Sequence, residues 1–226
     1  MNVYNVAIDG PAGAGKSTIA KMVAERLGFV YVDTGAMYRA LALYFVRLGI
    51  KPQEKEKIKQ ALPALHITLT YQDGKQVVLL DGENVNDFIR TQEVGSMASR
   101  ISPLPAVREK LLFLQRELAK RTSVIMDGRD IGTIVLPDAD IKIYLTADPG
   151  VRAKRRCLEL EAKGEECDEE EILREIIARD EQDMTREISP LKKAEDAVVL
   201  DASKLTAEEV TERLVALIRE RCEGCR

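Results

Sequence analysis

Residues 3–28 read VYNVAIDGPAGAGKSTIAKMVAERLG, and this stretch decides the fold of the chain. The apolar residues before Asp9 predict a short buried strand. The apolar residues after Thr18 recur at helical spacing, and Gly28 closes the predicted helix. A glycine-rich loop therefore joins a strand directly to a helix, an arrangement typical of phosphate binding in α/β proteins.

The loop itself has the spacing Gly-x-x-x-x-Gly-Lys-Ser. Glycines allow backbone N–H groups to surround phosphate oxygens at a distance that a Cβ atom would obstruct. We expect Lys16 to reach the β- and γ-phosphates of a nucleoside triphosphate and the Ser17 hydroxyl to bind Mg²⁺. The predicted nucleotide-binding residues are Gly10, Pro11, Ala12, Gly13, Ala14, Gly15, Lys16, Ser17 and Thr18.

Predicted strands and helices alternate along most of the chain. Alternation of this kind predicts an α/β protein with a doubly wound parallel sheet, here of the P-loop NTPase type. Further strands are expected at 29–32, 123–126, 141–145 and 197–200, and further helices at 35–48, 91–101, 105–119, 149–186 (broken near Gly164) and 206–222.

Residues 66–86 interrupt this alternation. Ile67, Leu69 and Tyr71 alternate with polar residues, and Asp-Gly pairs at 73–74 and 81–82 separate the apolar runs. Asp-Gly between apolar runs is typical of tight hairpin turns. We therefore expect a small three-stranded antiparallel sheet inserted into the α/β fold.

Length and charge exclude several classes of protein. A chain of 226 residues usually forms one domain and buries enough surface to need no disulfide or metal. The net charge is 34 − 38 = −4, which argues against binding a nucleic acid polymer. The N-terminus has no basic segment of a signal peptide, and no apolar run approaches the roughly 20 residues of a membrane span.

The four cysteines, Cys157, Cys167, Cys222 and Cys225, are few and lie late in the chain. Their number and position are unlike those of a secreted disulfide scaffold, so we expect a cytoplasmic protein. Cys222 and Cys225 have the spacing of a redox or zinc pair, but a second pair is absent from the sequence. We expect a frayed tail carrying two reduced thiols.

Arginines are grouped on two predicted helices. Arg152, Arg155 and Arg156 stand at i, i+3 and i+4, and Arg179, Asp183 and Arg186 stand at i, i+4 and i+7, so each set is expected to share a helix face. Like charges on one face repel one another, so these groups indicate a bound anion. Asp127-Gly-Arg-Asp130 follows a buried strand, at the edge of a parallel sheet where ligands bind.

Several segments together resemble the bacterial cytidylate kinases. The resemblance runs from about residue 3 to about residue 218, and the antiparallel insert fits it. It rests on the phosphate loop, Asp33-Thr-Gly-Ala-Met-Tyr-Arg39, Ile89-Arg-Thr-Gln-Glu-Val94, Val107-Arg108, Asp127-Gly-Arg-Asp-Ile-Gly-Thr133, Arg179-Asp-x-x-Asp183-x-x-Arg186 and Pro190-Leu191.

The resemblance implies a kinase that transfers the γ-phosphoryl group of ATP to CMP or dCMP with Mg²⁺ held at Ser17. It implies a monomer whose partners are these nucleotides, with no nucleic acid polymer and no membrane. It divides the single domain into a core (1–33, 105–148 and 187–226), a nucleoside-monophosphate region with the β insert (34–104) and a helical lid (149–186).

The resemblance also implies roles for individual residues. Catalysis would fall to Lys16, Arg129, Arg179 and Arg186, and ATP would contact the loop and Arg152, Arg155 and Arg156. The monophosphate of CMP would bind Thr34, Arg39 and Arg129, its cytosine would face Ser99, Arg108 and Asp130, and its sugar Arg179 and Asp183. Two alternatives remain: another P-loop small-molecule kinase, such as one for uridylate, another nucleoside monophosphate or shikimate, and a nucleotide-binding regulator with little turnover.

Overall fold

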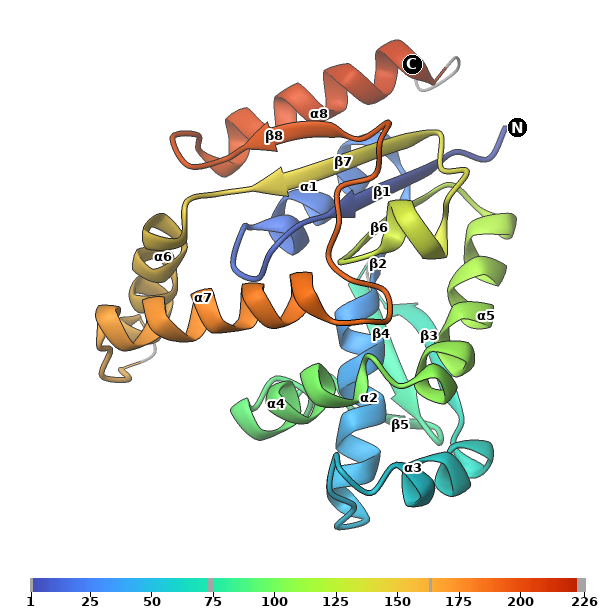
Figure 1. Ribbon diagram of the computed structural model, residues 1–226. Coiled ribbons are helices and arrows are strands. Elements are labelled where there is room, and N and C mark those ends of the chain that lie inside the picture. Colours follow the sequence, from blue (N-terminus) through green and yellow to red (C-terminus); the bar gives the residue numbers. More distant parts are fainter. Residues whose placement is uncertain (1, 73–74, 163, 223–226) are drawn as a thin grey trace. The chain divides into compact units, whose positions relative to one another are not determined.

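The structure is a computed structural model that describes residues 2–72, 75–162 and 164–222. The chain divides into two compact units, Met1–Val30 with Thr122–Arg226 as the first and Tyr31–Arg121 as the second. The elements of each unit are labelled in Figure 1. The first unit carries most of the parallel sheet, and the second carries the antiparallel insert.

The parallel sheet follows the predicted alternation of strands and helices. The central strand β1 pairs in parallel with β6 and β7, and in this register Asp9 lies opposite Gly128. The edge strand β2 joins at its first residue, where the Val30 N–H donates to the Ser123 carbonyl. The strand order is β2-β6-β1-β7-β8, with β1 at Asn5–Asp9, β2 at Val30–Asp33, β6 at Val124–Gly128, β7 at Ile141–Thr146 and β8 at Val198–Asp201.

The helices of the first unit form two packed pairs, α1 with α8 and α6 with α7. Their bounds are α1 Lys16–Leu27, α6 Pro149–Glu161, α7 Glu169–Thr185 and α8 Ala207–Arg221. The interruption predicted near Gly164 is confirmed, because α6 ends at Glu161 and α7 begins at Glu169. A short π-helix at Ile131–Val135, labelled η2, was not predicted.

The second unit is built around α2, which packs against α4, α5, β3 and β4 (Figure 1). Its elements are α2 Thr34–Arg47, α3 Lys55–Ala61, η1 Leu62–Ala64, β3 Ile67–Gln72, β4 Lys75–Leu80, β5 Glu83–Asn84, α4 Gln92–Ile101 and α5 Pro105–Arg121. The predicted antiparallel sheet is confirmed in the order β3-β4-β5. Asp81 and Gly82 form its second turn with φ of 50° and 88°, whereas residues 73–74 lie outside the described residues.

The cysteines differ from the sequence-based expectation. The structure joins Cys157 to Cys167 by a disulfide across the turn between α6 and α7, with the two Cα atoms 5.4 Å apart. These helices pack against one another, and the turn between them brings together residues that are ten apart in sequence. The expected frayed tail is wrong for Cys222, which is 1% exposed at the end of α8, and Cys225 lies outside the described residues.

Within the described ranges, we find no helix that is both long and apolar enough to cross a bilayer. The two units do not coincide with the division into core, monophosphate region and lid. Residues 105–121 form α5 of the second unit, and residues 149–186 fall in the first unit. The functional division therefore stays a prediction.

Candidate active site

The phosphate loop follows β1 and leads into α1, as the sequence predicts. Gly10 has φ of 152°, and a Cβ atom at this position would collide with the carbonyl oxygen of Leu145 on β7. Gly15 has φ of 88° and is the residue immediately before α1. The left-handed backbone that glycine permits thus turns the loop so that α1 begins with Lys16 and Ser17.

Lys16 is buried, and only 5% of it is exposed. Its Nζ donates to the Pro11 carbonyl at 2.6 Å, so the side chain folds back over the loop. Burial and the neighbouring Arg129 guanidinium lower the pKa of Lys16 to about 7, against the opposing effect of Asp127. A polyanionic ligand would favour the ammonium form, since opposite charge raises the pKa of a buried amine.

The Ser17 hydroxyl lies beside a carboxylate to which the sequence analysis gave no individual role. Ser17 Oγ donates to Asp127 Oδ2 at 2.8 Å, and Asp127 is 4% exposed near the end of β6. A hydroxyl and a carboxylate supply the hard oxygen ligands that Mg²⁺ prefers, so the two residues fit this ion. The signal was present in the sequence as the apolar run Val124–Met126 ending in an acid.

Asp183 on α7 lies between two of the predicted arginines. Arg129 Nε donates to Asp183 Oδ2 at 2.8 Å, and Arg186 Nη1 is 3.7 Å from Asp183 Oδ1. Arg186 Nε also donates to the Ser189 carbonyl at 2.5 Å, from a turn where Ser189 has φ of 52°. The structure therefore brings together Arg129, Asp183 and Arg186 from two separate segments.

Arg152 is 2% exposed. Its guanidinium donates to the carbonyls of Ala147 and Ala12, both at 2.9 Å, and to Asp180 Oδ2 at 2.6 Å. Ala12 belongs to the phosphate loop and Asp180 to α7. The buried pair thus connects the loop to the helix that also carries Asp183.

The other arginines of α6 and α7 do not share the surroundings of Arg152. Arg155 donates to the Ala202 carbonyl at 2.7 Å, and Arg156 pairs with Glu159 at 3.2 Å on the exposed surface. Arg179 is exposed on α7. The structure therefore separates the three α6 arginines that the helical spacing had grouped, and their roles toward ATP stay predictions.

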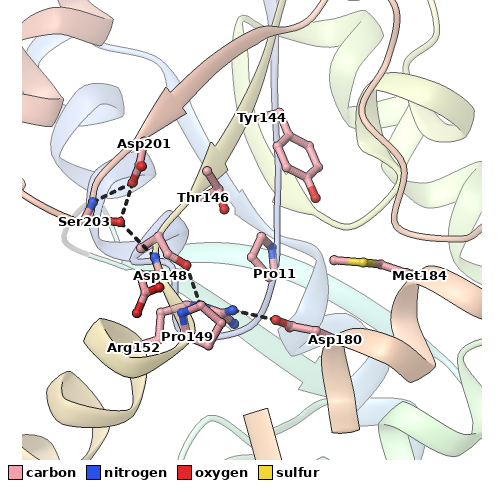
Figure 2. Close-up of a pocket in the computed structure, with 11 residues that line it drawn as sticks. Pro11, Tyr144, Thr146, Asp148, Pro149, Arg152, Asp180, Met184, Asp201 and Ser203 are labelled. Carbon is pink, nitrogen blue, oxygen red and sulfur yellow. Dashed lines mark hydrogen bonds and ion pairs between the residues drawn. The ribbon is translucent and has the colours of Figure 1, made fainter. Parts of the chain in front are cut away.

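A cavity of about 400 Å³ opens beside the phosphate loop, at the ends of β7 and β8 (Figure 2). The buried Arg152–Asp180 pair forms one wall. On another wall, Ser203 Oγ donates to Asp201 and accepts the Asp148 N–H, each contact drawn in Figure 2. The lining residues are Pro11, Tyr144, Thr146, Ala147, Asp148, Pro149, Arg152, Asp180, Met184, Asp201 and Ser203.

Asp9 is the last residue of β1 and directly precedes the loop. Its carboxylate accepts the backbone N–H groups of Ile131 at 2.8 Å and Gly132 at 2.7 Å, at the start of the π-helix. Burial raises the pKa of Asp9 to about 6, although both hydrogen bonds act in the opposite direction. The segment that Asp9 holds follows immediately on Arg129 and Asp130, and Asp130 is 5% exposed.

In the second unit, Asp33 gathers two guanidinium groups. Asp33 caps α2 by accepting the Ala36 N–H at 2.8 Å, and its Oδ2 lies 3.3 Å from Arg39 and 3.4 Å from Arg90. Thr34 begins α2 and is 3% exposed. The sequence analysis gave no role to Arg90, although the arginine lies in one of the segments that carry the family resemblance.

Ser99 and Arg108, the predicted base-facing residues of the second unit, are connected through Ser102. The Ser102 hydroxyl donates to the Ser99 carbonyl at 3.1 Å, and Arg108 Nη1 donates to the Ser102 carbonyl at 3.3 Å. Arg108 is 9% exposed, and its guanidinium lies 5.9 Å from the centre of the Tyr38 ring. A buried guanidinium within cation–π distance of an aromatic ring is restricted in its orientation.

Solved structures of low sequence identity share the fold. An uncharacterized protein from Eubacterium ventriosum superposes with a TM-score of 0.55 at 16% identity, covering 97% of this chain and 100% of its own. TT1252 from Thermus thermophilus superposes with a TM-score of 0.52 at 18% identity, covering 99% of this chain and 100% of its own. At such identities the likeness concerns the fold alone.

Sequence comparison reaches much closer relatives. A protein of Caldicellulosiruptor saccharolyticus named cytidylate kinase is 54% identical over 217 residues, which are 96% of each chain. A cytidylate kinase of Carboxydothermus hydrogenoformans is 47% identical over 94% of this chain and 96% of its own. The family model described as cytidylate kinase matches residues 6–220. The chain therefore belongs to the cytidylate kinase family.

Proposed function

We propose that the protein transfers the γ-phosphoryl group of ATP to CMP or dCMP, giving CDP or dCDP and ADP. One observation carries the proposal beyond the family: Asp183 holds Arg129 and Arg186 close to Lys16 of the phosphate loop. Phosphoryl transfer between two polyanions depends on positioning and on charge stabilisation, which these residue types supply.

The donor binds at the phosphate loop in this proposal. Backbone N–H groups of the loop and the start of α1 hold the phosphates, and Lys16 bears on the charge of the transferring group. Ser17 and Asp127 hold Mg²⁺, which neutralises phosphate charge when it is bound. The cavity beside the loop offers carboxylate and hydroxyl oxygens, which suit the N–H and O–H groups of a base or sugar better than a phosphate.

The acceptor supplies its own nucleophile. The second pKa of a phosphomonoester is about 6, so CMP is mostly dianionic at pH 7 and needs no protein base. The residues proposed to hold its phosphate are Thr34, Arg39 and Arg129. Arg179 and Asp183 are proposed for its sugar, and Arg186 for the charge that develops on the transferring group.

A carboxylate, that of Asp130, and a guanidinium, that of Arg108, select cytosine in this proposal. Cytosine presents an amino donor at N4 and acceptors at N3 and O2, which match Asp130 and Arg108 respectively. Uracil places a carbonyl where the amino group stands, so Asp130 would face another acceptor. Burying such a mismatch costs about 1–3 kcal/mol, which corresponds to roughly 10–100-fold in preference. The pair would therefore reject uracil as well as attract cytosine.

ADP release from ATP and Mg²⁺, measured with and without CMP, tests the proposal. We expect release that depends strictly on CMP and yields equal amounts of CDP and ADP. A nucleotide-binding regulator would instead bind ATP without acceptor-dependent turnover, and that result would remove the proposed function. We propose in addition that the protein acts in the cytoplasm as a monomer, which sedimentation at working concentrations would test.

A further inference from the structure

The antiparallel insert contacts the strand that leads into α2 through the side chain of Gln76 on β4. Gln76 Oε1 accepts the Asp33 N–H at 2.8 Å, and Gln76 Nε2 donates to the Asp33 carbonyl at 3.3 Å. A single amide side chain therefore satisfies both backbone groups of Asp33. A neighbouring strand would offer the same two hydrogen bonds, so Gln76 acts here as a one-residue extension of a sheet.

Tyr71 on β3 makes a second contact of the same kind. Its hydroxyl donates to the Tyr31 carbonyl at 3.0 Å, two residues before Asp33. Tyr71 and Gln76 lie opposite one another in the β3–β4 ladder. Burial raises the pKa of Tyr71 to about 12, so the hydroxyl remains protonated and a donor at neutral pH. The cross-strand pair Tyr71–Gln76 therefore hydrogen-bonds to β2 at two alternate residues, Tyr31 and Asp33.

Asn86 holds Gln76 in place from the other side. Its Nδ2 donates to the Gln76 carbonyl at 3.0 Å, and its Oδ1 accepts the Val78 N–H at 3.1 Å. Asn86 thus continues the edge of the insert beyond the end of β5. The backbone of Gln76 is fixed on one edge by β3 and on the other by Asn86, which leaves its side chain aimed at Asp33.

Asp33, whose backbone is hydrogen-bonded by Gln76, also contacts two arginines through its side chain. The Asp33 carboxylate caps α2 and lies within ion-pair distance of Arg39 and Arg90. Gly35 leaves the space in which Arg39 folds back, since a Cβ atom there would lie 3.2 Å from both the Arg39 guanidinium and Asp33 Oδ1. A displacement of the Asp33 backbone would move the start of α2 and the guanidinium of Arg39 together.

We propose that Tyr71 and Gln76 are positioning residues, through which the antiparallel insert fixes Asp33 and so orients Thr34 and Arg39 toward the acceptor phosphate. The inference rests on the proposed function. It gives the insert a direct part in acceptor binding, through hydrogen bonds to backbone atoms and without contact to the nucleotide.

Two variants remove the contacts with little change in shape. Gln76→Glu keeps the acceptor for the Asp33 N–H but replaces the donor to the Asp33 carbonyl with an oxygen, and Tyr71→Phe removes only the hydroxyl. We expect KM for CMP to rise about tenfold in Gln76→Glu and about threefold in Tyr71→Phe, in line with the loss of a single hydrogen bond. KM for ATP should change less than twofold, and kcat at saturating CMP should stay within about threefold of the wild type.

Gln72→Glu is the matched control, because Gln72 is exposed on the same insert. It should leave both KM values unchanged. The inference is overturned if Gln76→Glu and Tyr71→Phe keep the wild-type KM for CMP, or if they raise both KM values equally. If Gln76→Glu lowers the melting temperature too far to be assayed, Tyr71→Phe decides alone. A wild-type protein that does not phosphorylate CMP would instead refute the proposed function.

Discussion

Asp9 and Gly132 are joined by a 2.7 Å hydrogen bond between residues 123 apart in sequence. The Gly132 N–H donates to the carboxylate of Asp9, which stands immediately before the phosphate loop. Gly132 lies two residues after Asp130, the proposed reader of the cytosine amino group. The bond therefore connects the phosphate loop to the segment of the proposed base reader within one unit.

The raised pKa of Asp9 predicts a specific dependence of stability on pH. The pKa of Asp9 rises from 3.8 to about 6 on folding, so between these pH values the folded state binds more protons than the unfolded state. The contribution of Asp9 to the free energy of unfolding is therefore greatest below about pH 4, and it is lost as the pH rises through 6. The groups that act on it are the N–H donors of Ile131 and Gly132 and the charges of Asp130 and Lys16.

Asp9→Asn removes this titration. We expect the free energy of unfolding of the wild type to fall by about 3 kcal/mol relative to the variant between pH 4 and pH 7, since the shift is about two pKa units. Denaturant unfolding at a series of pH values measures the difference. Asp138→Asn, at an exposed position, should show no such trend. A constant difference between wild type and Asp9→Asn would contradict the account.

Lys16→Ala should lower kcat/KM by about 10³-fold or more while the melting temperature changes little, because Lys16 bears on charge in the transition state. Steady-state kinetics with CMP measures the loss. Lys21→Ala, on the exposed part of the same helix, is the matched control and should retain wild-type kinetics. If Lys16→Ala keeps a tenth of the wild-type activity, Lys16 does not have this role.

Chelation of Mg²⁺ should abolish turnover, and Asp127→Asn should raise the Mg²⁺ concentration for half-maximal activity about tenfold or more. The reason is that the amide retains a hydrogen-bonding partner for Ser17 but loses the negative charge. A Mg²⁺ titration at fixed ATP measures the shift. An unchanged Mg²⁺ requirement in Asp127→Asn would show that the carboxylate beside Ser17 does not bind the ion.

Arg129 and Asp130 are adjacent in the sequence, but replacing each by alanine should change the kinetics in a different way. Asp130→Ala should raise KM for CMP and reduce the ratio of kcat/KM for CMP over UMP by about tenfold, because the group that rejects the uracil carbonyl is gone. Arg129→Ala should lower activity with every acceptor and leave the ratio nearly unchanged, since phosphate contacts position while base contacts specify. Asp130→Asn separates packing from selectivity and should not restore the ratio. The reverse pattern would refute this assignment.

The sequence predicted the fold well because its signals were local. The glycine loop, the spacing of apolar residues and the turn at Asp81–Gly82 each lie within a few residues of one another. The α6 arginines show where this reasoning ends. Helical spacing grouped Arg152 with Arg155 and Arg156, but Arg152 is buried against Ala12 and Asp180, which are brought to it only by the folded chain.

Long-range contacts were missed for the same reason. The pairing of Ser17 with Asp127 and the grip of Gln76 on Asp33 join segments that are 110 and 43 residues apart. In neither case does a local pattern reveal which residue is the partner. The apolar run before Asp127 could have indicated a metal-binding acid, whereas nothing in the sequence marks Gln76. The π-helix at Ile131–Val135 begins with an N–H that donates to Asp9 on β1, and this contact likewise has no local signature.

The central claim is that the protein selects cytosine monophosphates as acceptors. The most direct measurement is kcat/KM with ATP and Mg²⁺ for CMP, dCMP, UMP, AMP and GMP under identical conditions. We predict that CMP and dCMP are phosphorylated, with CMP preferred over UMP by roughly 10–100-fold and with AMP and GMP as poorer acceptors still. A preference for UMP, AMP or GMP would contradict the account.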